Sequence, residues 1–308
     1  MENHVRGVFV DANDTLAEIF ERQRKPGDPD VSVHEDPNIT PEAWPALLGG
    51  AEIGIVDHTA LPTEIARQCA GLQHVVFLGT GARSYMNPDE LATLGIEVHL
   101  IKGYGDTAVA EAAIALMWAS ARGLAQMDRE MRAGNWLRDD AMQLTGKTLG
   151  LIGFGGIAAE VARIALGSGM RVIAWNRTPK TSAGVEFVSL VRLFADSHVV
   201  SLHLLLNDET RGFLSRERIV ALRPGVILVN TARGALVDEA AMLEALNSGH
   251  IRHAGLDVFN VEPLPRDHPL TKLPNVTLSA HSAFRTPEAS ENLISAAWEH
   301  CRRIAKGA

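Results

Sequence analysis

The chain has 308 residues and a formal net charge of −8, with 46% hydrophobic and 21% charged residues. Because one hydrophobic core rarely serves more than about 250–300 residues, this length predicts two domains. The acidic balance argues against nucleic-acid binding, and the lack of an uncharged apolar stretch of about 18 residues argues against a membrane span.

The first third of the chain alternates short β-rich runs with segments long enough for helices. Its predicted strands lie at residues 7–10, 53–56, 74–78 and 96–100. Such alternation is typical of a parallel α/β sheet. The next segment, residues 108–122, is predicted to be a helix that is apolar on nearly every side, with an N-cap at Asp106-Thr107. We therefore expect this helix to be buried.

A second β/α series follows this helix. Its predicted strands lie at residues 148–152, 171–175, 198–202, 226–230 and 275–278. A last helix, predicted over residues 286–305, is too short to be a domain, so it should pack on a unit already built. The pattern predicts the α/β class, with two doubly wound parallel-sheet domains.

A glycine-rich string, Gly-Phe-Gly-Gly-Ile-Ala, stands between a predicted strand and a predicted helix and begins at Gly153. In a dinucleotide fingerprint, Gly153 permits the tight turn and Gly155 lets the backbone approach a pyrophosphate. Gly156 and Ile157 start the helix whose N–H groups hold the phosphates, and Ala158 stays small for packing. A glycine turn that binds no nucleotide, or a methyltransferase turn, remains an alternative.

The end of the next predicted strand indicates which nicotinamide cofactor is used. An acid about twenty residues after the glycines would bind the ribose hydroxyls of NAD, and methyltransferases also favour an acid there. Here Asn176 stands instead, followed by Arg177, Thr178 and Lys180, with no Asp or Glu between residues 171 and 185. The sequence therefore predicts NADP(H). The alternative is that these cations are solvated and that NAD serves as well.

Three polar residues, Arg233, Glu262 and His281, each follow a β-rich run. Ligands of open α/β sheets bind beyond the carboxyl ends of the strands, so these residues are candidates for a site. A guanidinium pairs with a carboxylate, and an imidazole exchanges protons near neutral pH. Asp257 is a rival to Glu262. Taken singly, each could also be a structural or surface residue.

Metal and disulfide chemistry are not indicated. His250 and His253 lack supporting ligands nearby in the sequence, and no His and Cys pair has metal-ligand spacing, so we predict no metal. The two cysteines, Cys69 and Cys301, are far apart, and the N-terminal residues show no signal-peptide pattern. We expect a cytoplasmic protein.

Four strings carry a family resemblance. They are Gly-Phe-Gly-Gly-Ile-Ala from Gly153, Asn-Thr-Ala-Arg-Gly-Ala-Leu-Val-Asp-Glu from Asn230, Ala-Gly-Leu-Asp-Val-Phe-Asn-Val-Glu-Pro from Ala254, and Leu-Pro-Asn-Val-Thr-Leu-Ser-Ala-His from Leu273. Together they resemble the D-isomer-specific 2-hydroxyacid dehydrogenase family, and glyoxylate and hydroxypyruvate reductases within it. The resemblance extends from about Gly79 to the C-terminus, whereas residues 1–70 match only in the rhythm of their strands.

The resemblance implies an activity and a role for each candidate. The enzyme would transfer a hydride between a nicotinamide cofactor and C2 of a small 2-oxo or 2-hydroxy acid. Arg233 would bind the substrate, Glu262 would orient His281, and His281 would donate the proton. The remaining implied contacts are those of the Gly79-Thr80-Gly81 amides with the substrate carboxylate, and those of Asp257, Thr231 and Ala232 with the nicotinamide.

The resemblance also implies a domain arrangement. A Rossmann cofactor domain, residues 104–283, would be inserted in a flavodoxin-like substrate domain made of residues 1–103 and 284–308. Family members usually form homodimers through their cofactor domains, and Met131 to Asp140, with Trp136, would take part in that contact here.

Three departures from the family pattern, and two alternatives, stay open. Ala280 replaces a common proline, Gly156 replaces a frequent arginine, and Asn176 replaces the expected Asp. Substrate identity depends on loops around His58, Thr80, Arg83 and Tyr104, which no motif specifies. The alternatives are a nicotinamide-sensing interaction protein without catalysis, and a formate-type or phosphite-type dehydrogenase on the same fold.

Overall fold

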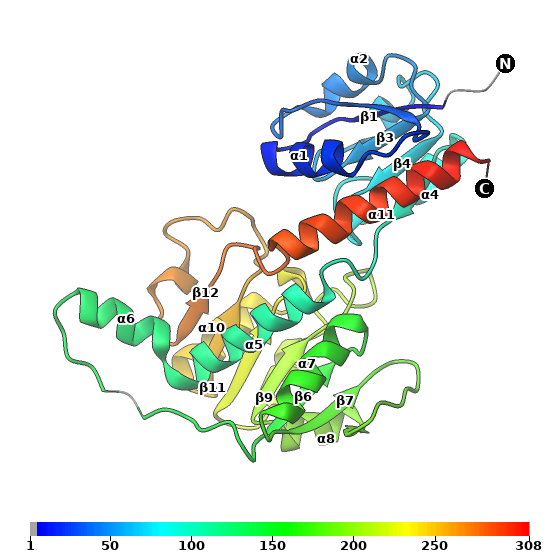
Figure 1. Cartoon of the computed structure of the whole chain (residues 1–308). Helices are drawn as coiled ribbons and strands as arrows, with labels where there is room; N and C mark the ends of the chain where they lie inside the picture. The colour runs from blue at the N-terminus through cyan, green and yellow to red at the C-terminus, as the bar shows by residue number, and fades with distance from the viewer. Residues whose placement is uncertain (1–4, 139, 308) are drawn as a thin grey trace. The chain divides into compact units, whose positions relative to one another are not determined.

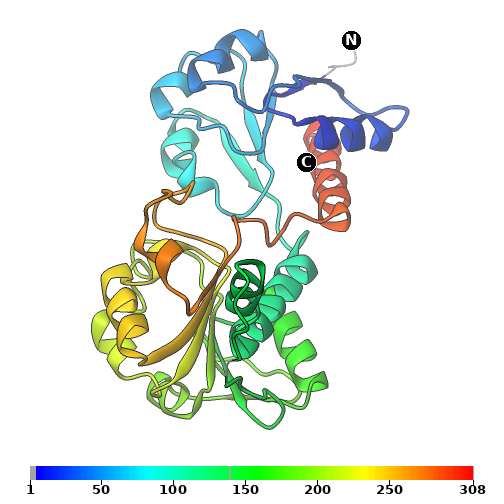
Figure 2. The same cartoon turned by 90° about the vertical axis from the view of Figure 1, so that its left-hand side faces the viewer.

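The computed structural model describes residues 5–138 and 140–307, which divide into two compact units (Figure 1). The first unit contains the residues up to Gly105 and those from Thr286 onward, and the second runs from Asp106 to Arg285. Figure 2 shows the consequence for the first unit, in which the red C-terminal helix lies beside the blue N-terminal helix.

The first unit is built on a five-stranded parallel sheet. Its strands are β1 (Arg6–Phe9), β2 (Asp30–Val33), β3 (Ile53–Val56), β4 (His74–Phe77) and β5 (Glu97–Leu100). They are arranged in the order β2-β1-β3-β4-β5. This is the strand order of flavodoxin-like folds, as expected from the sequence. The central strand β3 is buried along its whole length, because helices cover both faces of the sheet.

Two long helices cover one face of this sheet. They are α1 (Asp14–Gln23), capped by Asn13, and α11 (Pro287–Ala305), capped by Thr286. The rings of Phe20 and Trp298 stack at 4.2 Å, and Trp298 Nε1 donates a hydrogen bond to the Phe20 carbonyl. The last helix therefore packs on the N-terminal unit, as predicted. The other face is covered by short helices: η1 (Pro41–Ala43), α2 (Trp44–Leu48), α3 (Thr63–Ala66), η2 (Ala82–Ser84) and α4 (Pro88–Thr93).

The second unit contains a seven-stranded parallel sheet. Its strands are β6 (Thr148–Ile152), β7 (Arg171–Trp175), β8 (Val185–Phe187), β9 (Val199–Leu202), β10 (Val226–Asn230), β11 (Ile251–Leu256) and β12 (Val276–Leu278). The order β12-β11-β10-β9-β6-β7-β8 reverses direction between β6 and β9. This is the Rossmann order, in which a dinucleotide binds at the reversal point.

Helices cover both faces of the second sheet (Figure 1). One buried cluster joins the sheet to α5 and α7, and another joins it to α8, α9 and α10. Seven of the 17 residues of α5 are buried, so the burial predicted for this helix holds for one side of it only. The helices are α5 (Asp106–Arg122), α6 (Leu124–Arg132), α7 (Gly156–Gly167), α8 (Leu190–Asp196), α9 (Arg216–Val220), η3 (Gly234–Leu236), α10 (Glu239–Ser248) and η4 (Pro269–Lys272).

Three strands escaped the sequence analysis. β2 and β8 are short strands at sheet edges and contain acidic residues, so they lack an apolar run. β11 is interrupted by Arg252 and His253, yet His253 is buried and faces Thr277 of β12 across a 3.0 Å contact. The contact with Thr277 allows the polar His253 to be buried within a strand, which a search for apolar runs in the sequence does not predict.

No single helix among the described residues is both long and apolar enough to span a membrane, although the bent pair α5 and α6 meets the length and composition criteria jointly.

Candidate active site

The glycine loop joins β6 to α7 in a conformation that only glycine tolerates at its first position. Gly153 has φ +88°, and a Cβ there would lie 2.6 Å from the carbonyl oxygen of His203. Gly155 is the N-cap of α7, and a Cβ on it would meet no atom within 4 Å. The backbone at Gly155 is therefore open to an approaching group, and the N–H groups at Gly156 and Ile157 begin the helix.

Gly156, which replaces the family's frequent arginine, lies against Asp106, an acid that the sequence analysis named only as part of a helix N-cap. The carboxylate of Asp106, the first residue of α5, occupies the place where a Cβ of Gly156 would stand. Burial raises the pKa of Asp106, and the nearby Glu160 adds to the effect. A negative charge thus stands at the helix terminus where a pyrophosphate would bind.

We expect Asp106→Asn to bind NADPH several-fold more tightly than the parent, because it removes repulsion of the pyrophosphate and keeps the side-chain shape. The gain should shrink as the pH falls, since burial raises the pKa of Asp106 and its carboxyl group is neutralised at a higher pH than an ordinary one. Fluorescence titration of NADPH measures it. Asp196→Asn, which removes an acid paired with Arg192 on α8, is the matched control, and an equal gain there would refute the assignment.

Asn176 connects the ends of β6 and β7. Its Oδ1 accepts a hydrogen bond from the Phe154 N–H at 3.0 Å, and its Nδ2 donates to the Thr178 carbonyl at 2.7 Å. Lys180 Nζ donates to the Phe154 carbonyl at 2.6 Å. Asn176 and Lys180, which the sequence analysis placed at the ribose of the cofactor, are therefore hydrogen-bonded to the backbone of the glycine loop.

Arg177 is paired with Glu209, and both side chains are about three-quarters exposed. Counting acids between residues 171 and 185 could not reveal this partner, because it is contributed by the segment after β9. An exposed ion pair of this kind contributes little stability. Arg177 can therefore exchange Glu209 for an anionic ligand at small cost.

The end of β10 offers a buried polar group without a partner. Among the described residues, Thr231 Oγ1 is buried and makes no hydrogen bond. Such a group is unfavourable unless a ligand or water satisfies it. Together with the open backbone at Gly155, it fits a nicotinamide dinucleotide lying across the carboxyl ends of β6 and β10.

His281 and Glu262 form a close pair. His281 Nδ1 lies 2.6 Å from Glu262 Oε2, and Glu262 Oε1 accepts a hydrogen bond from the Phe259 N–H at 2.8 Å. Both side chains are one-third exposed. The carboxylate thus orients the imidazole and occupies Nδ1, which leaves Nε2 as the nitrogen that can serve a substrate.

Asp257 holds the loop that carries His281. Its buried carboxylate accepts hydrogen bonds from Ser279 Oγ at 2.6 Å and from the N–H groups of Ser282 and Ala283, each at 3.0 Å. The N–H of His281 donates to the Asp257 carbonyl at 2.8 Å, and His281 has a left-handed φ of +48°. Asp257 is therefore a positioning residue, whereas Glu262 is the acid that contacts the imidazole.

Arg233 leaves β10 through a turn organised by a buried amide. Asn230 Oδ1 accepts from the Ala232 N–H at 3.0 Å, and Asn230 Nδ2 donates to the Arg233 carbonyl at 2.9 Å. An Arg233 guanidinium nitrogen donates to the Ala232 carbonyl at 2.7 Å. Both backbone groups of Ala232 are therefore engaged within the turn, and the sequence analysis missed this positioning role of Asn230.

The three candidate catalytic residues lie at the carboxyl end of the strands of the second sheet. Arg233 follows β10, Glu262 follows β11 and His281 follows β12, and these strands are parallel neighbours. The glycine loop, which follows β6, lies at the same end of the sheet. A guanidinium, an imidazole paired with a carboxylate, and a glycine loop therefore share the end of the sheet where ligands bind in this architecture.

The first unit presents a loop after β4, residues 79–81. The N–H of Gly79 donates to the Phe77 carbonyl at 2.8 Å and is therefore engaged. Within the described residues, the N–H groups of Thr80 and Gly81 make no hydrogen bond. Of the three amides predicted to bind a carboxylate, these two are available.

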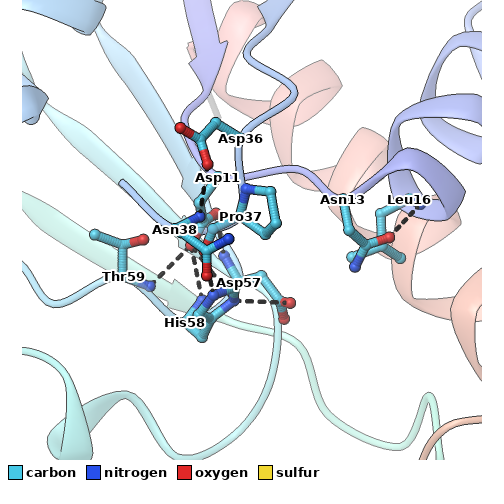
Figure 3. Close-up of polar contacts among 9 residues, drawn as sticks. All are labelled: Asp11, Asn13, Leu16, Asp36, Pro37, Asn38, Asp57, His58 and Thr59. Atoms are coloured by element: carbon cyan, nitrogen blue, oxygen red, sulfur yellow. Dashed lines mark hydrogen bonds and ion pairs between the residues drawn. The ribbon is translucent and has the colours of Figure 1, made fainter. Parts of the chain in front are cut away.

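Figure 3 shows a charged cluster at the carboxyl end of β3, the strand that pairs with β4. The buried Asp11 accepts the N–H groups of Asp57, His58 and Thr59 at 2.8 to 2.9 Å. His58 Nδ1 lies 3.2 Å from Asp57, and His58 Nε2 donates to the Pro37 carbonyl at 2.6 Å. Both ring nitrogens are engaged, so His58 clamps two loops together and offers no free donor to a substrate.

This clamp makes the stability of the protein depend on pH. The bond to Asp57, reinforced by Asp11 and opposed by burial, raises the pKa of His58 from 6.5 to about 9. A histidine whose pKa is higher in the folded protein than in the unfolded chain stabilises the fold fully at a pH below its unfolded pKa. It no longer does so at a pH above its folded pKa. We therefore expect His58→Gln to lower the free energy of unfolding at about pH 6, with the difference from the parent vanishing above about pH 9.

Urea denaturation of the parent and of His58→Gln across this pH range measures the effect. His250→Gln, which removes a histidine bonded to the Ile219 carbonyl, is the control. A difference that stays constant with pH, or that grows as the pH rises, would contradict a charged His58.

Comparison with known proteins assigns the chain to a class and a family. Residues 114–283 match the family model described as D-isomer specific 2-hydroxyacid dehydrogenase, NAD binding domain. The chain is 39% identical to a glyoxylate reductase of Aeropyrum pernix, over 98% of this chain and 92% of that protein. The class is that of nicotinamide-dependent oxidoreductases. The chain belongs to the D-isomer-specific 2-hydroxyacid dehydrogenase family, as the sequence motifs indicated.

Two further relatives agree. A hydroxypyruvate reductase of Thermotoga maritima is 43% identical over 65% of this chain and 67% of its own length. The structure of an acyclic imino acid reductase, Bsp5, in complex with NADPH and D-Arg has a TM-score of 0.86 and 28% identity. That match covers 98% of this chain and 97% of the other.

Proposed function

We propose that this chain uses NADPH to reduce the C2 carbonyl of a small 2-oxo acid, with glyoxylate or hydroxypyruvate as substrate. The observation that carries the proposal is the 2.6 Å pair of His281 and Glu262 at the sheet edge that also bears Arg233 and the glycine loop. The named relatives reduce these two acids, which supports the substrate class.

The mechanism requires a proton and a positive charge where the C2 oxygen becomes negative. The bound nicotinamide supplies the hydride that C2 accepts. His281 Nε2 donates the proton to the oxygen, while Glu262 favours the charged imidazole and keeps its orientation. Asp257 keeps His281 in place through the loop that its carboxylate organises.

We assign binding of the substrate carboxylate to Arg233, and the carboxylate contact of the Gly79, Thr80 and Gly81 amides of the first unit stays a prediction from the sequence. Arg233 presents a planar guanidinium that matches a carboxylate and polarises the adjacent carbonyl. Among cofactor contacts, we assign the pyrophosphate to the backbone of Gly155, Gly156 and Ile157. The nicotinamide is assigned to the Thr231 hydroxyl, whereas Asp257 and the Ala232 backbone, also predicted to contact it, already form hydrogen bonds within the protein.

Selection of NADPH rests on the replacement of an acid by Asn176. We assign the 2′-phosphate to Arg177, Thr178 and Lys180. Arg177→Ala should weaken NADPH binding by about tenfold or more and leave NADH nearly unchanged. Glu209→Gln should favour NADPH further, because it frees Arg177 from its partner. Steady-state kinetics with both cofactors measures these changes, and equal effects on NADPH and NADH would refute the assignment.

A substrate screen tests the proposed activity. Oxidation of NADPH and NADH is followed with glyoxylate, hydroxypyruvate, pyruvate and bulkier 2-oxo acids, and we expect the highest kcat/KM with NADPH and one of the first two. Turnover of formate or phosphite alone would favour the dehydrogenase alternative, and cofactor binding without turnover would favour a sensor. The reductase names of the relatives favour neither alternative.

We also propose a homodimer formed through the cofactor units. α6 and the segment after it expose Leu124, Met131 and Trp136, the last with 74% of its surface accessible. Asp139, within the segment predicted to make the contact, lies outside the described residues. Light scattering of the purified protein at two concentrations tests this assembly.

A further inference from the structure

Three potential metal ligands meet in the first unit at the amino-terminal end of its sheet, the end opposite to Thr80 and Gly81. His74 is the first residue of β4, Glu97 is the first residue of β5, and the two are register partners. His99 stands two residues after Glu97 on the same strand. Residues two apart on a strand share a face, so all three side chains project from the same face of the sheet.

The distances between these side chains suit a small metal ion. His74 Nδ1 lies 3.1 Å from His99 Nε2 and 3.9 Å from Glu97 Oε2. One ligand atom from each residue lies within 4.8 Å of the others. Ligand atoms around a tetrahedral zinc ion are about 3.3 Å apart, so small side-chain rotations would complete the geometry.

We propose that His74, Glu97 and His99 bind a divalent transition-metal ion, of which Zn²⁺ is the best representative. Two imidazoles and one carboxylate favour zinc and its neighbours over Mg²⁺ or Ca²⁺, which take oxygen ligands. Water would complete the coordination, because Glu97 is 69% exposed and gives access from solvent. The proposal departs from the absence of metal predicted from the sequence, where only ligands close along the chain were considered.

The protonation of the cluster agrees with this geometry. Two ring nitrogens 3.1 Å apart cannot both carry a proton, so at least one presents a lone pair. Neutral imidazole is the form that binds metals.

The residues around the cluster belong to the first unit. The His300 ring of α11 lies 5.3 Å from that of His99, and its Nδ1 accepts a hydrogen bond from Arg303 at 2.8 Å. β5 is an edge strand, so an ion held by His74 and His99 would fasten it to β4. The inferred role is stabilisation of this sheet edge, because an ion that binds only the folded chain stabilises it.

Calorimetric titration of the chelator-treated full-length protein with Zn²⁺ tests the proposal. We expect one ion bound through this cluster per chain, and a higher melting temperature with Zn²⁺. His74→Gln, His99→Gln and Glu97→Gln should each weaken this binding about tenfold or more and reduce the thermal shift. His250→Gln, on the second unit, is the control and should bind as the parent does.

Glu97→Gln keeps the inference testable if a histidine variant folds poorly, because residue 97 is exposed. Circular dichroism of the metal-free variants checks their folding. The proposal is overturned if the parent binds no Zn²⁺, or if folded Glu97→Gln and His99→Gln proteins bind Zn²⁺ with the affinity of the parent.

Discussion

Arg233→Ala is expected to lower kcat/KM for the 2-oxo acid by at least ~100-fold, which corresponds to about 2.7 kcal/mol of transition-state stabilisation. We expect a large loss because, in the proposed mechanism, the guanidinium binds the substrate carboxylate and stabilises the charge that develops on the C2 oxygen. Steady-state kinetics under saturating NADPH measures it.

Arg266→Ala provides the control for this variant, because Arg266 is an exposed arginine in a loop of the same unit. It should retain parental kcat/KM. Near-normal turnover by a folded Arg233→Ala protein would mean that Arg233 only shapes the turn after β10.

His281→Ala should lower kcat by about 100-fold or more and leave the affinity for NADPH almost unchanged. Proton donation is lost, whereas the glycine loop and Thr231 are untouched. Rapid-quench or steady-state rates give kcat, and fluorescence titration gives the cofactor affinity. A large loss of NADPH binding with little loss of kcat would instead make His281 a structural residue of the loop held by Asp257.

The sequence predicted four of the five described strands of the first unit and five of the seven of the second unit. In the second unit, strands buried on both faces read as continuous apolar runs, so β6, β7, β9 and β10 were visible as runs. The short edge strands β2 and β8 were not, because each contains an acidic, exposed residue and too few buried residues to form an apolar run. In the first unit the strand order came from the family resemblance, and the structure confirms it as flavodoxin-like.

The candidate catalytic residues were predictable because each follows a strand. Their partners were not. Asp106 meets Gly156, Glu209 meets Arg177, and Asn230 organises the turn of Arg233, each through contacts that depend on how separate loops are placed. The sequence shows which residue type follows which strand. It does not show which residues of other loops neutralise its charge, because those contacts depend on the folded structure.

The central claim is that this chain transfers hydride directly to C2 of a 2-oxo acid. NADPH carrying deuterium at its transferable C4 position is incubated with the parent protein and glyoxylate, and the product is examined by proton NMR. The account predicts glycolate with one deuterium on C2. Product without deuterium at C2, or no product with glyoxylate, hydroxypyruvate or pyruvate, would contradict it.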